Sequence, residues 1–133
     1  MIYLYTRYKS GCASTIKAKK WLKMYDIEYE VLFPKDITEK HIKEMLRLSD
    51  SMDDIILSRS VGRKIWEELK LNQESLERMS LKSFMRLLAK HPVLLKTLII
   101  FDDKKIVTGY NEDEIRAFLP EKYRQVIRRR IAM

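Results

Sequence analysis

The chain has 133 residues, which is enough for one domain with a sizeable core and too few for several domains. Its 27 basic residues outnumber its 19 acidic ones and give a net charge of +8, which favours a polyanionic partner or an acidic protein surface. One cysteine and two histidines exclude an internal disulfide and a cysteine-rich zinc site.

The N-terminal stretch MIYLYTRYK alternates like a strand and lacks the apolar core of a cleavable leader. No apolar run reaches the length needed to cross a bilayer. We therefore expect a cytoplasmic protein that makes no contact with membranes. We also expect it to be a monomer.

The first half of the chain alternates between strand and helix patterns. Ile2–Thr6 is rich in β-branched and aromatic residues, a helical spacing of apolar residues follows from Ala18 to Tyr25, and Ile27–Phe33 alternates again. Asp36 and Glu39 predict a capping box for a second helix that runs through four apolar residues, Ile42, Met45, Leu46 and Leu48. The strand–helix–strand order predicts a parallel pair of strands.

The second half begins with a region that has no strand pattern. Residues 50–91 carry apolar residues at spacings that fit several short helices. Thr97–Phe101 and Lys105–Val107 flank the turn sequence DDKK and predict a β-hairpin. Asn111, with Glu114 three residues later, caps a further helix, and Pro120 suits the first turn of a last one.

This order of elements predicts an α/β fold with a mixed sheet. The arrangement βαβα…ββα is that of a thioredoxin-like domain interrupted by a central helical subdomain. We expect a single domain over residues 1–133, with residues 1–49 and 92–133 as the thioredoxin-like core and residues 50–91 as the helical insertion.

Cys12 stands at the predicted start of the first helix. A thiol there faces unpaired backbone N–H groups and the positive end of the helix dipole, and nearby lysines add positive charge, so a reactive thiolate is chemically reasonable. The alternative is a small residue that packs in the interior and does no chemistry. A two-thiol switch needs a second cysteine three residues later, but Thr15 occupies that position.

The end of the chain is strongly basic. After Leu119 there is one acidic residue, Glu121, and there are five basic ones, Lys122, Arg124, Arg128, Arg129 and Arg130. Such a segment is either a solvated helix face or a surface that lies close to nucleic acid.

Several short motifs in a fixed order carry a resemblance to a known family. They are LYT at residues 4–6, Cys-x-Ser at residues 12–14 followed by KAKKWL at residues 17–22, Leu46-Arg47, Arg59-Ser60, HPVLL at residues 91–95 and GYNEDEIRAFLP at residues 109–120. With these motifs the chain closely resembles, nearly from end to end, the Spx transcriptional regulators. That family belongs to the arsenate-reductase-like branch of thioredoxin folds.

The resemblance implies a regulator and not an enzyme. It implies binding to the C-terminal domain of the RNA polymerase α subunit, control of promoters during thiol stress, no enzymatic activity and no cofactor. Promoter DNA would be contacted weakly or through polymerase, by Arg59, Arg63, Lys64 and the C-terminal arginines. It also implies turnover by the ClpXP protease. The apolar tail at residues 131–133 is either the signal for this turnover or a frayed end without a role.

Three positions matter for the enzymatic alternative, a monothiol oxidoreductase or an arsenate-reductase-like enzyme that uses Cys12. Arsenate reductases hold an oxyanion with three arginines, and the resemblance aligns these with Arg59, Thr97 and Lys105. Lysine offers only a point charge and threonine none, so the cradle is weakened and arsenate reduction is disfavoured. Because Thr15 replaces the second cysteine, the disulfide switch of the family is expected to be missing as well.

The resemblance also suggests a polymerase-binding surface. Arg47 matches an arginine at the α-subunit contact, and a glycine usual in the family falls near Ser51 or Met52. A side chain there weakens docking if the contact requires glycine, whereas serine serves if the loop merely turns. We expect the helix after Cys12, Arg47 and the loop 49–53 to form one docking patch. The alternative for Arg47 is a solvated helix residue.

Overall fold

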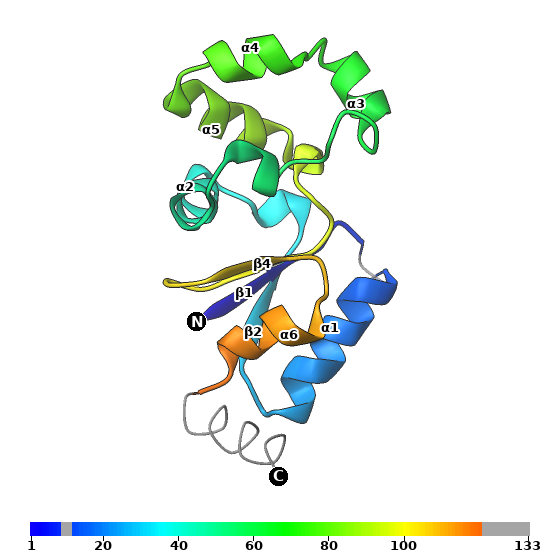
Figure 1. Ribbon diagram of the computed structural model, residues 1–133, viewed down its shortest axis with the longest axis vertical. Coiled ribbons are helices and arrows are strands. Elements are labelled where there is room, and N and C mark those ends of the chain that lie inside the picture. Colours follow the sequence, from blue (N-terminus) through cyan, green and yellow to red (C-terminus); the bar gives the residue numbers. More distant parts are fainter. Residues whose placement is uncertain (9–11, 121–133) are drawn as a thin grey trace.

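A four-stranded sheet runs through the middle of the protein in a computed structural model that describes residues 1–8 and 12–120 (Figure 1). The strands lie in the order β2-β1-β3-β4. The central strand, β1 (Ile2–Tyr5), pairs in parallel with β2 (Tyr29–Leu32). It pairs antiparallel with β3 (Ile99–Phe101), which forms a hairpin with β4 (Ile106–Thr108). The predicted mixed α/β fold of thioredoxin-like order is confirmed.

Helices cover both faces of this sheet. On one face lie α1 (Ala13–Met24), α6 (Glu112–Ile115) and the 3₁₀ turn η4 (Arg116–Phe118). The other face carries the remaining helices, which are α2 (Glu39–Leu48), α3 (Arg63–Glu68), α4 (Gln73–Arg78) and α5 (Leu81–Lys90).

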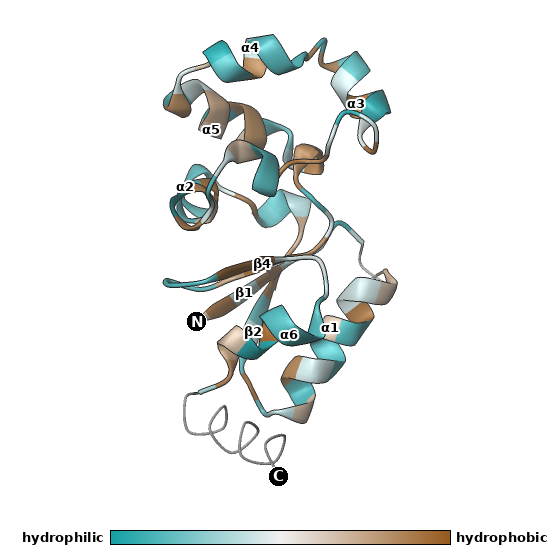
Figure 2. Ribbon diagram, viewed as in Figure 1, coloured by the Kyte–Doolittle hydropathy of each residue, from teal (hydrophilic) through white to brown (hydrophobic). Residues whose placement is uncertain are grey.

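Alternation along β1 explains why two separate cores form. Leu4 points into the cluster that contains Trp21 of α1, whereas Tyr5 points into the cluster that contains Met45 of α2 and Leu88 of α5. Hydrophobic colours follow the strands and the inner side of α5, whereas the outer helix α4 is mostly hydrophilic (Figure 2).

The short helices predicted for the middle of the chain are present in the structure. Two contacts hold this segment to the strand that follows it. Ile56 forms an isolated antiparallel bridge with Leu95, and the Lys96 N–H donates to the Ile55 carbonyl at 2.8 Å. Because α2 and α5 share one apolar cluster, the proposed insertion continues the core of the preceding residues; the division into core and insertion stays a prediction.

The predicted capping box before α2 is wrong in its residues. Asp36 belongs to a 3₁₀ turn, η1 (Pro34–Asp36), where its carboxylate accepts from the Phe33 N–H at 2.9 Å. The helix cap is Thr38, whose hydroxyl accepts from the His41 N–H, while His41 Nδ1 accepts from the Thr38 N–H at 3.1 Å. The imidazole therefore does what a glutamate usually does in such a box.

Two further predictions concern the ends of elements. Asn111 caps α6, since its side-chain oxygen accepts from the N–H groups of Asp113 and Glu114. The last predicted helix, after Pro120, lies outside the described residues. Within the described residues, none of the helices is long and apolar enough to cross a membrane.

Candidate functional site

Cys12 is the N-cap of α1. It follows β1 in the chain and lies where the first helix begins (Figure 1). The thiol is half-buried. The backbone carbonyl of Cys12 accepts from the Ile16 N–H at 3.0 Å, and this is the first hydrogen bond of the helix. The neutral thiol accepts no capping hydrogen bond from the first turn of the helix.

Two threonines continue from this thiol into the interior. The Cys12 Sγ lies 3.3 Å from the Thr15 hydroxyl, and that hydroxyl lies 3.1 Å from the hydroxyl of Thr6. Both threonines are fully buried and are the only buried polar or charged residues in the described part of the chain. Thr15 thus links the Cys12 thiol to Thr6 in a buried hydrogen-bonded row.

The pKa of the Cys12 thiol reflects opposing influences. Burial is the largest single one and raises the pKa, because it disfavours the charged thiolate. Hydrogen bonds from the Thr15 hydroxyl and from the backbone N–H groups of Thr15, Ser14 and Cys12 act in the other direction. Together they prevail, so the pKa of Cys12 lies below its usual value.

The three positions aligned with the oxyanion-binding arginines do not come together. Thr97 lies just before β3, at the end of the sheet where β1 leaves toward Cys12, because Tyr5 pairs with Ile99. Lys105 lies beyond the other end of β3, where Phe101 pairs with Tyr3. Arg59 is exposed beside a separate groove that also contains Lys96. The hairpin carries Lys105 away from Cys12, which is consistent with the expectation that an oxyanion cradle is weakened in this chain.

Lys105 has a structural contact of its own. Its Nζ donates to the carbonyl of Ala117 in η4, which ties the hairpin turn to the helices on one face of the sheet. Its own N–H donates to the Asp102 carboxylate at 2.7 Å, as does that of Lys104 at 2.8 Å. The lysine is thus engaged within the fold.

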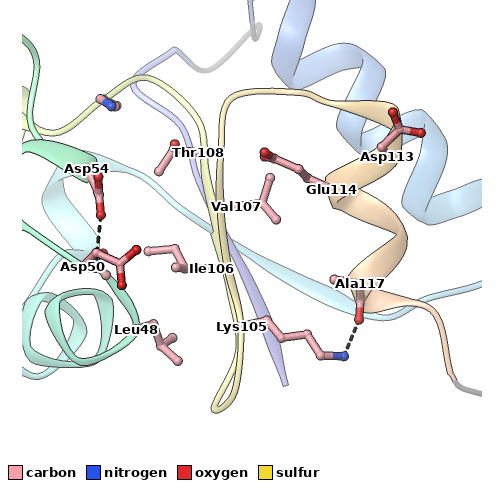
Figure 3. A pocket seen from close by; sticks show the side chains of 12 residues that line it. Leu48, Asp50, Asp54, Lys105, Ile106, Val107, Thr108, Asp113, Glu114 and Ala117 are labelled. Atoms are coloured by element: carbon pink, nitrogen blue, oxygen red, sulfur yellow. Dashed lines mark hydrogen bonds between the residues drawn. The ribbon is translucent and has the colours of Figure 1, made fainter.

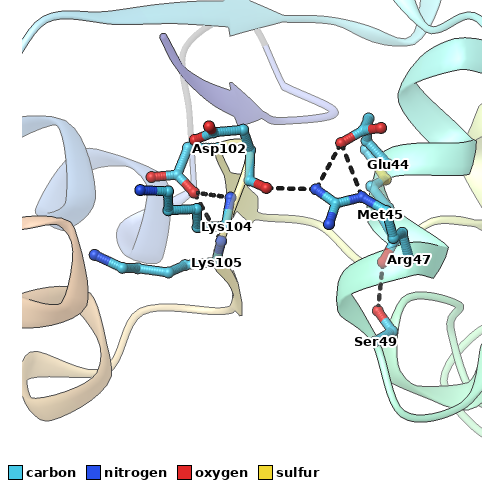
Figure 4. Close-up of polar contacts among 8 residues, drawn as sticks. Glu44, Met45, Arg47, Ser49, Asp102, Lys104 and Lys105 are labelled. Atoms are coloured by element: carbon cyan, nitrogen blue, oxygen red, sulfur yellow. Dashed lines mark hydrogen bonds and ion pairs between the residues drawn. The ribbon is translucent and has the colours of Figure 1, made fainter.

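Arg47 makes the corresponding tie from the opposite face (Figure 4). In the last turn of α2, its guanidinium donates to the Glu44 carboxylate, at 2.9 Å from Nη2 and 3.3 Å from Nε, and to the Asp103 carbonyl in the hairpin turn. Half of the side chain, 51%, remains exposed. Arg47 is therefore held in a defined orientation at the surface and is more than a solvated helix residue.

The loop after Arg47 needs no glycine. Ser51 has a φ of −150°, an extended conformation open to any residue, and its hydroxyl accepts from the Asp53 N–H at 3.1 Å. It caps the 3₁₀ turn η2 (Met52–Asp54). Ser51 and Met52 line a groove of about 440 Å³ beside α4 and α5, formed with apolar residues that include Leu76, Met79 and Phe84.

The docking patch predicted from the sequence is divided by the sheet. Arg47 and the loop 49–53 belong to the face that carries α2, whereas α1 packs on the opposite face (Figure 1). The physical reason is the pleat of β1, which sends neighbouring residues, and the helices they contact, to opposite sides. Arg47 at the end of α2, with Ser51 and Met52 in the loop that follows, stays a predicted binding surface, whereas α1 packs on the other face of the sheet.

Sequence reasoning missed two partners in these arrangements. Thr6 follows a strand, and only the register of that strand reveals that it faces Thr15. Asp103 contributes a backbone carbonyl, which leaves no trace in the residue type. For Thr6, the sequence did contain one signal: a polar residue at the end of an apolar strand, which could have indicated a buried hydrogen bond.

Comparisons with known proteins agree with this geometry. Residues 8–118 match the ArsC family model. The chain is 41% identical to the global transcriptional regulator Spx of Bacillus subtilis (strain 168) over 127 residues, which are 93% of this chain and 91% of that protein. It is 39% identical to the global transcriptional regulator Spx 2 of Oceanobacillus iheyensis over 121 residues, 89% of this chain and 85% of the relative.

Solved structures share the fold at lower identity. A Staphylococcus aureus COL protein superposes with a TM-score of 0.69 at 24% identity, covering 88% of this chain and 97% of its own. An ArsC family related protein from Bacteroides fragilis gives a TM-score of 0.67 at 24% identity, covering 87% and 95%. On the combined match of family model and relatives, the chain belongs to the ArsC family and, within it, to the Spx group.

Proposed function

We propose that this protein is a transcriptional regulator that binds the C-terminal domain of the RNA polymerase α subunit and changes promoter use under stress. The observation that carries the proposal is the half-exposed guanidinium of Arg47, which Glu44 and the Asp103 carbonyl hold in place at the surface. An arginine that is already oriented loses little side-chain freedom on binding, which favours a specific contact with an acidic or carbonyl-rich surface. The similarity to Spx regulators over most of the chain supports the same function.

The proposal includes that the protein is not an enzyme. An oxyanion cradle at Cys12 would need several cations around the thiol, but Lys105 is bound to Ala117 at the other end of the sheet. The single cysteine also leaves no partner within the chain to resolve an oxidised Cys12. We therefore infer that regulation acts through the amount of protein, with turnover by the ClpXP protease, and not through a disulfide.

Location and DNA contacts follow from this function. A protein that works on polymerase resides in the cytoplasm, and we infer that it acts there as a monomer. Arg59, Arg63 and Lys64 are exposed and can reach phosphates, although Arg63 already pairs with Glu67 at 3.0 Å. Contacts of this kind read no sequence, so promoter choice would come from polymerase. The C-terminal basic residues, the second part of this predicted DNA surface, lie outside the described residues.

The test is a binding measurement with the isolated α-subunit domain. Arg47→Gln removes the guanidinium and is expected to weaken binding by about tenfold or more, the loss typical of a central interface arginine. Arg116→Gln is the matched control, because Arg116 is similarly exposed, at 43%, and also pairs with a carboxylate, that of Asp113 at 3.8 Å, but lies in η4 on the opposite face of the sheet. Equal affinity of Arg47→Gln and wild type would remove Arg47 from the interface.

Glu44→Gln separates a direct role of Arg47 from a structural one. It removes the carboxylate partner but leaves the guanidinium and its bond to Asp103 available. Binding close to wild type is expected if Arg47 contacts the polymerase domain itself. The enzymatic alternative is checked in parallel: turnover of arsenate or of a mixed disulfide, abolished by Cys12→Ser, would contradict the non-enzymatic assignment.

A further inference from the structure

The outer strand of the sheet, β4, has an open edge. Its register with β3 pairs Ile100 with Val107, and the flanking bonds run from Gly109 N–H to the Leu98 carbonyl at 2.8 Å and from Asp102 N–H to the Lys105 carbonyl at 3.0 Å. In an antiparallel pair, bonded and non-bonded residues alternate. Ile106 and Thr108 therefore direct their N–H and C=O groups outward, and β4 has no second neighbouring strand in the described residues.

This edge forms the floor of a groove of about 630 Å³ (Figure 3). One wall comes from the end of α2 and the loop after it, with Leu48, Ser49, Asp50 and Asp54. The other comes from α6 and η4, with Asp113, Glu114 and Ala117. Ile106 and Thr108 point toward the first wall and Val107 toward the second, so side chains of an added strand would also alternate between the walls.

The walls carry charge opposite to that of the whole protein. Four carboxylates line the groove, against two lysines, Lys96 and Lys105. The Lys105 ammonium is bonded to Ala117, and none of the ion pairs in the described part of the chain involves Asp50 or Glu114. In a chain of net charge +8, this groove is thus a local acidic site with two uncommitted carboxylates, one on each wall.

We propose that the open edge of β4 binds an extended lysine- or arginine-rich segment of a partner protein as an additional strand. Main-chain groups of Ile106 and Thr108 would supply the hydrogen bonds that give affinity. Asp50 and Glu114 would contact successive basic side chains on the two sides of that strand and give selectivity for positive charge. The β4 groove shares Ser49 and Asp50 with the Ser51–Met52 groove, but the inference does not rest on the proposed function, because its main-chain contacts lie on β4.

Other occupants fit these observations less well. A second copy paired edge to edge would bring four carboxylates against four more, and like charges at an interface oppose binding. A metal ion would need a tighter arrangement, because no group of three or more potential ligand residues in the described part of the chain could hold one. Charges beside an edge strand can also prevent any other strand from pairing with it. The experiment must therefore distinguish a protected edge from one that binds a peptide.

The experiment uses the full chain and a blocked seven-residue peptide, VKKVKKV, labelled for fluorescence anisotropy, in which adjacent lysines fall on opposite sides of the strand and so face both walls. Saturable binding is expected, together with amide shift changes in NMR spectra at Ile106 and Thr108. Methylation of alternate backbone nitrogens of the peptide removes its donors without changing its charge, and is expected to weaken binding at least about tenfold, the loss of several main-chain bonds. A peptide with glutamate in place of lysine should not bind.

Two double variants test the walls. Asp50→Asn with Glu114→Gln is expected to weaken binding of the lysine peptide by about tenfold and to reduce its salt dependence. Glu28→Gln with Glu30→Gln makes the same charge change around β2, at the other edge of the sheet, and is expected to leave binding unchanged. Equal weakening by both pairs would mean that only net charge matters, which overturns the assigned site.

Hydrogen exchange in the free protein identifies competing occupants. The Ile106 and Thr108 amides are expected to exchange quickly without peptide and slowly with it. Slow exchange in the free, dilute protein would mean that the chain covers its own edge, and protection that grows with protein concentration would mean that a second copy does. Either result, like a failure of the lysine peptide to bind, overturns the proposal.

Discussion

The two ends of the sheet use polar residues in different ways. At the end where β1 leads to α1, the thiol of Cys12 and the hydroxyls of Thr15 and Thr6 form an uncharged row that runs into the buried interior. At the hairpin end, charged side chains are bound to backbone carbonyls, Lys105 to Ala117 on one face and Arg47 to Asp103 on the other.

This difference separates reactivity from rigidity in the same small fold. The hairpin turn is held from both faces of the sheet by cations, so positive charge that an anion-binding site could use is engaged in structural contacts. The Cys12 end keeps a thiol with a lowered pKa, and no cation of the described residues is among the groups that lower it.

The largest effect is expected from breaking the buried row. Thr15→Val keeps the shape of the side chain but leaves the Thr6 hydroxyl and the Cys12 thiol without their partner. The free energy of unfolding, measured with urea, should therefore fall by about 1–3 kcal/mol. Thr6→Val should cost a similar amount. Because the double variant removes both polar groups, its cost should fall below the sum of the single costs by about 0.5 kcal/mol or more.

Wild type, the two single variants and the double variant form a double-mutant cycle. Thr97→Val is the control, since Thr97 lies at the same end of the sheet but is only half-buried. Strict additivity of Thr6→Val and Thr15→Val would contradict coupling between the two hydroxyls.

A smaller effect is expected at the hairpin end. Lys105→Met keeps the apolar stem but loses the bond to the Ala117 carbonyl, so the free energy of unfolding should fall by about 1 kcal/mol, and amides of α6 and η4 should exchange faster. Lys104→Met is the matched control, because Lys104 is exposed and should change stability by less than about 0.5 kcal/mol. Equal effects of the two variants would mean that the tie contributes nothing.

The smallest effect concerns the ionisation of Cys12. Its pKa is lower in the folded protein than in the unfolded chain, so the thiolate stabilises the fold at pH values above the unfolded pKa, and this contribution disappears as the pH falls through the folded pKa. The stability difference between wild type and Cys12→Ser should therefore move in favour of wild type as the pH rises through this range.

The rate of alkylation by iodoacetamide gives a direct check on this pKa. Its midpoint should lie below that of a free cysteine and should move upward in Thr15→Val, which lacks a hydrogen bond to the sulfur. A midpoint unchanged by Thr15→Val would contradict the role assigned to that hydroxyl.

Local patterns predicted most of the fold. The alternation over Ile2–Thr6 and the hairpin around DDKK agree with the structure to within two residues at each end, because strand alternation and turn residues are local properties. The cap of α2 was predicted wrongly because Asp36, which looks like a cap, is used by the turn at Pro34. A competing local hydrogen bond of this kind has no signature in spacing alone.

The candidate site could be predicted less well, since it depends on which face and which end of the sheet each residue reaches. The family resemblance aligned Arg59, Thr97 and Lys105 with three arginines of one site. The hairpin register, which the alignment does not contain, puts Lys105 at the far end of β3. The contacts of Arg47 with a backbone carbonyl and the open edge of β4 follow from strand order, which the sequence left undetermined.

The position of β1 has a consequence for how the protein is made. This strand lies at the centre of the sheet, yet its antiparallel partner β3 follows nearly the whole described chain later, with Leu4 opposite Ile100. At roughly 5–20 residues per second, a ribosome takes several seconds to add the intervening segment. Throughout that interval, β1 can pair only with β2, so completion of the sheet awaits the synthesis of β3, and the apolar side chains of β1 stay accessible to chaperones and proteases.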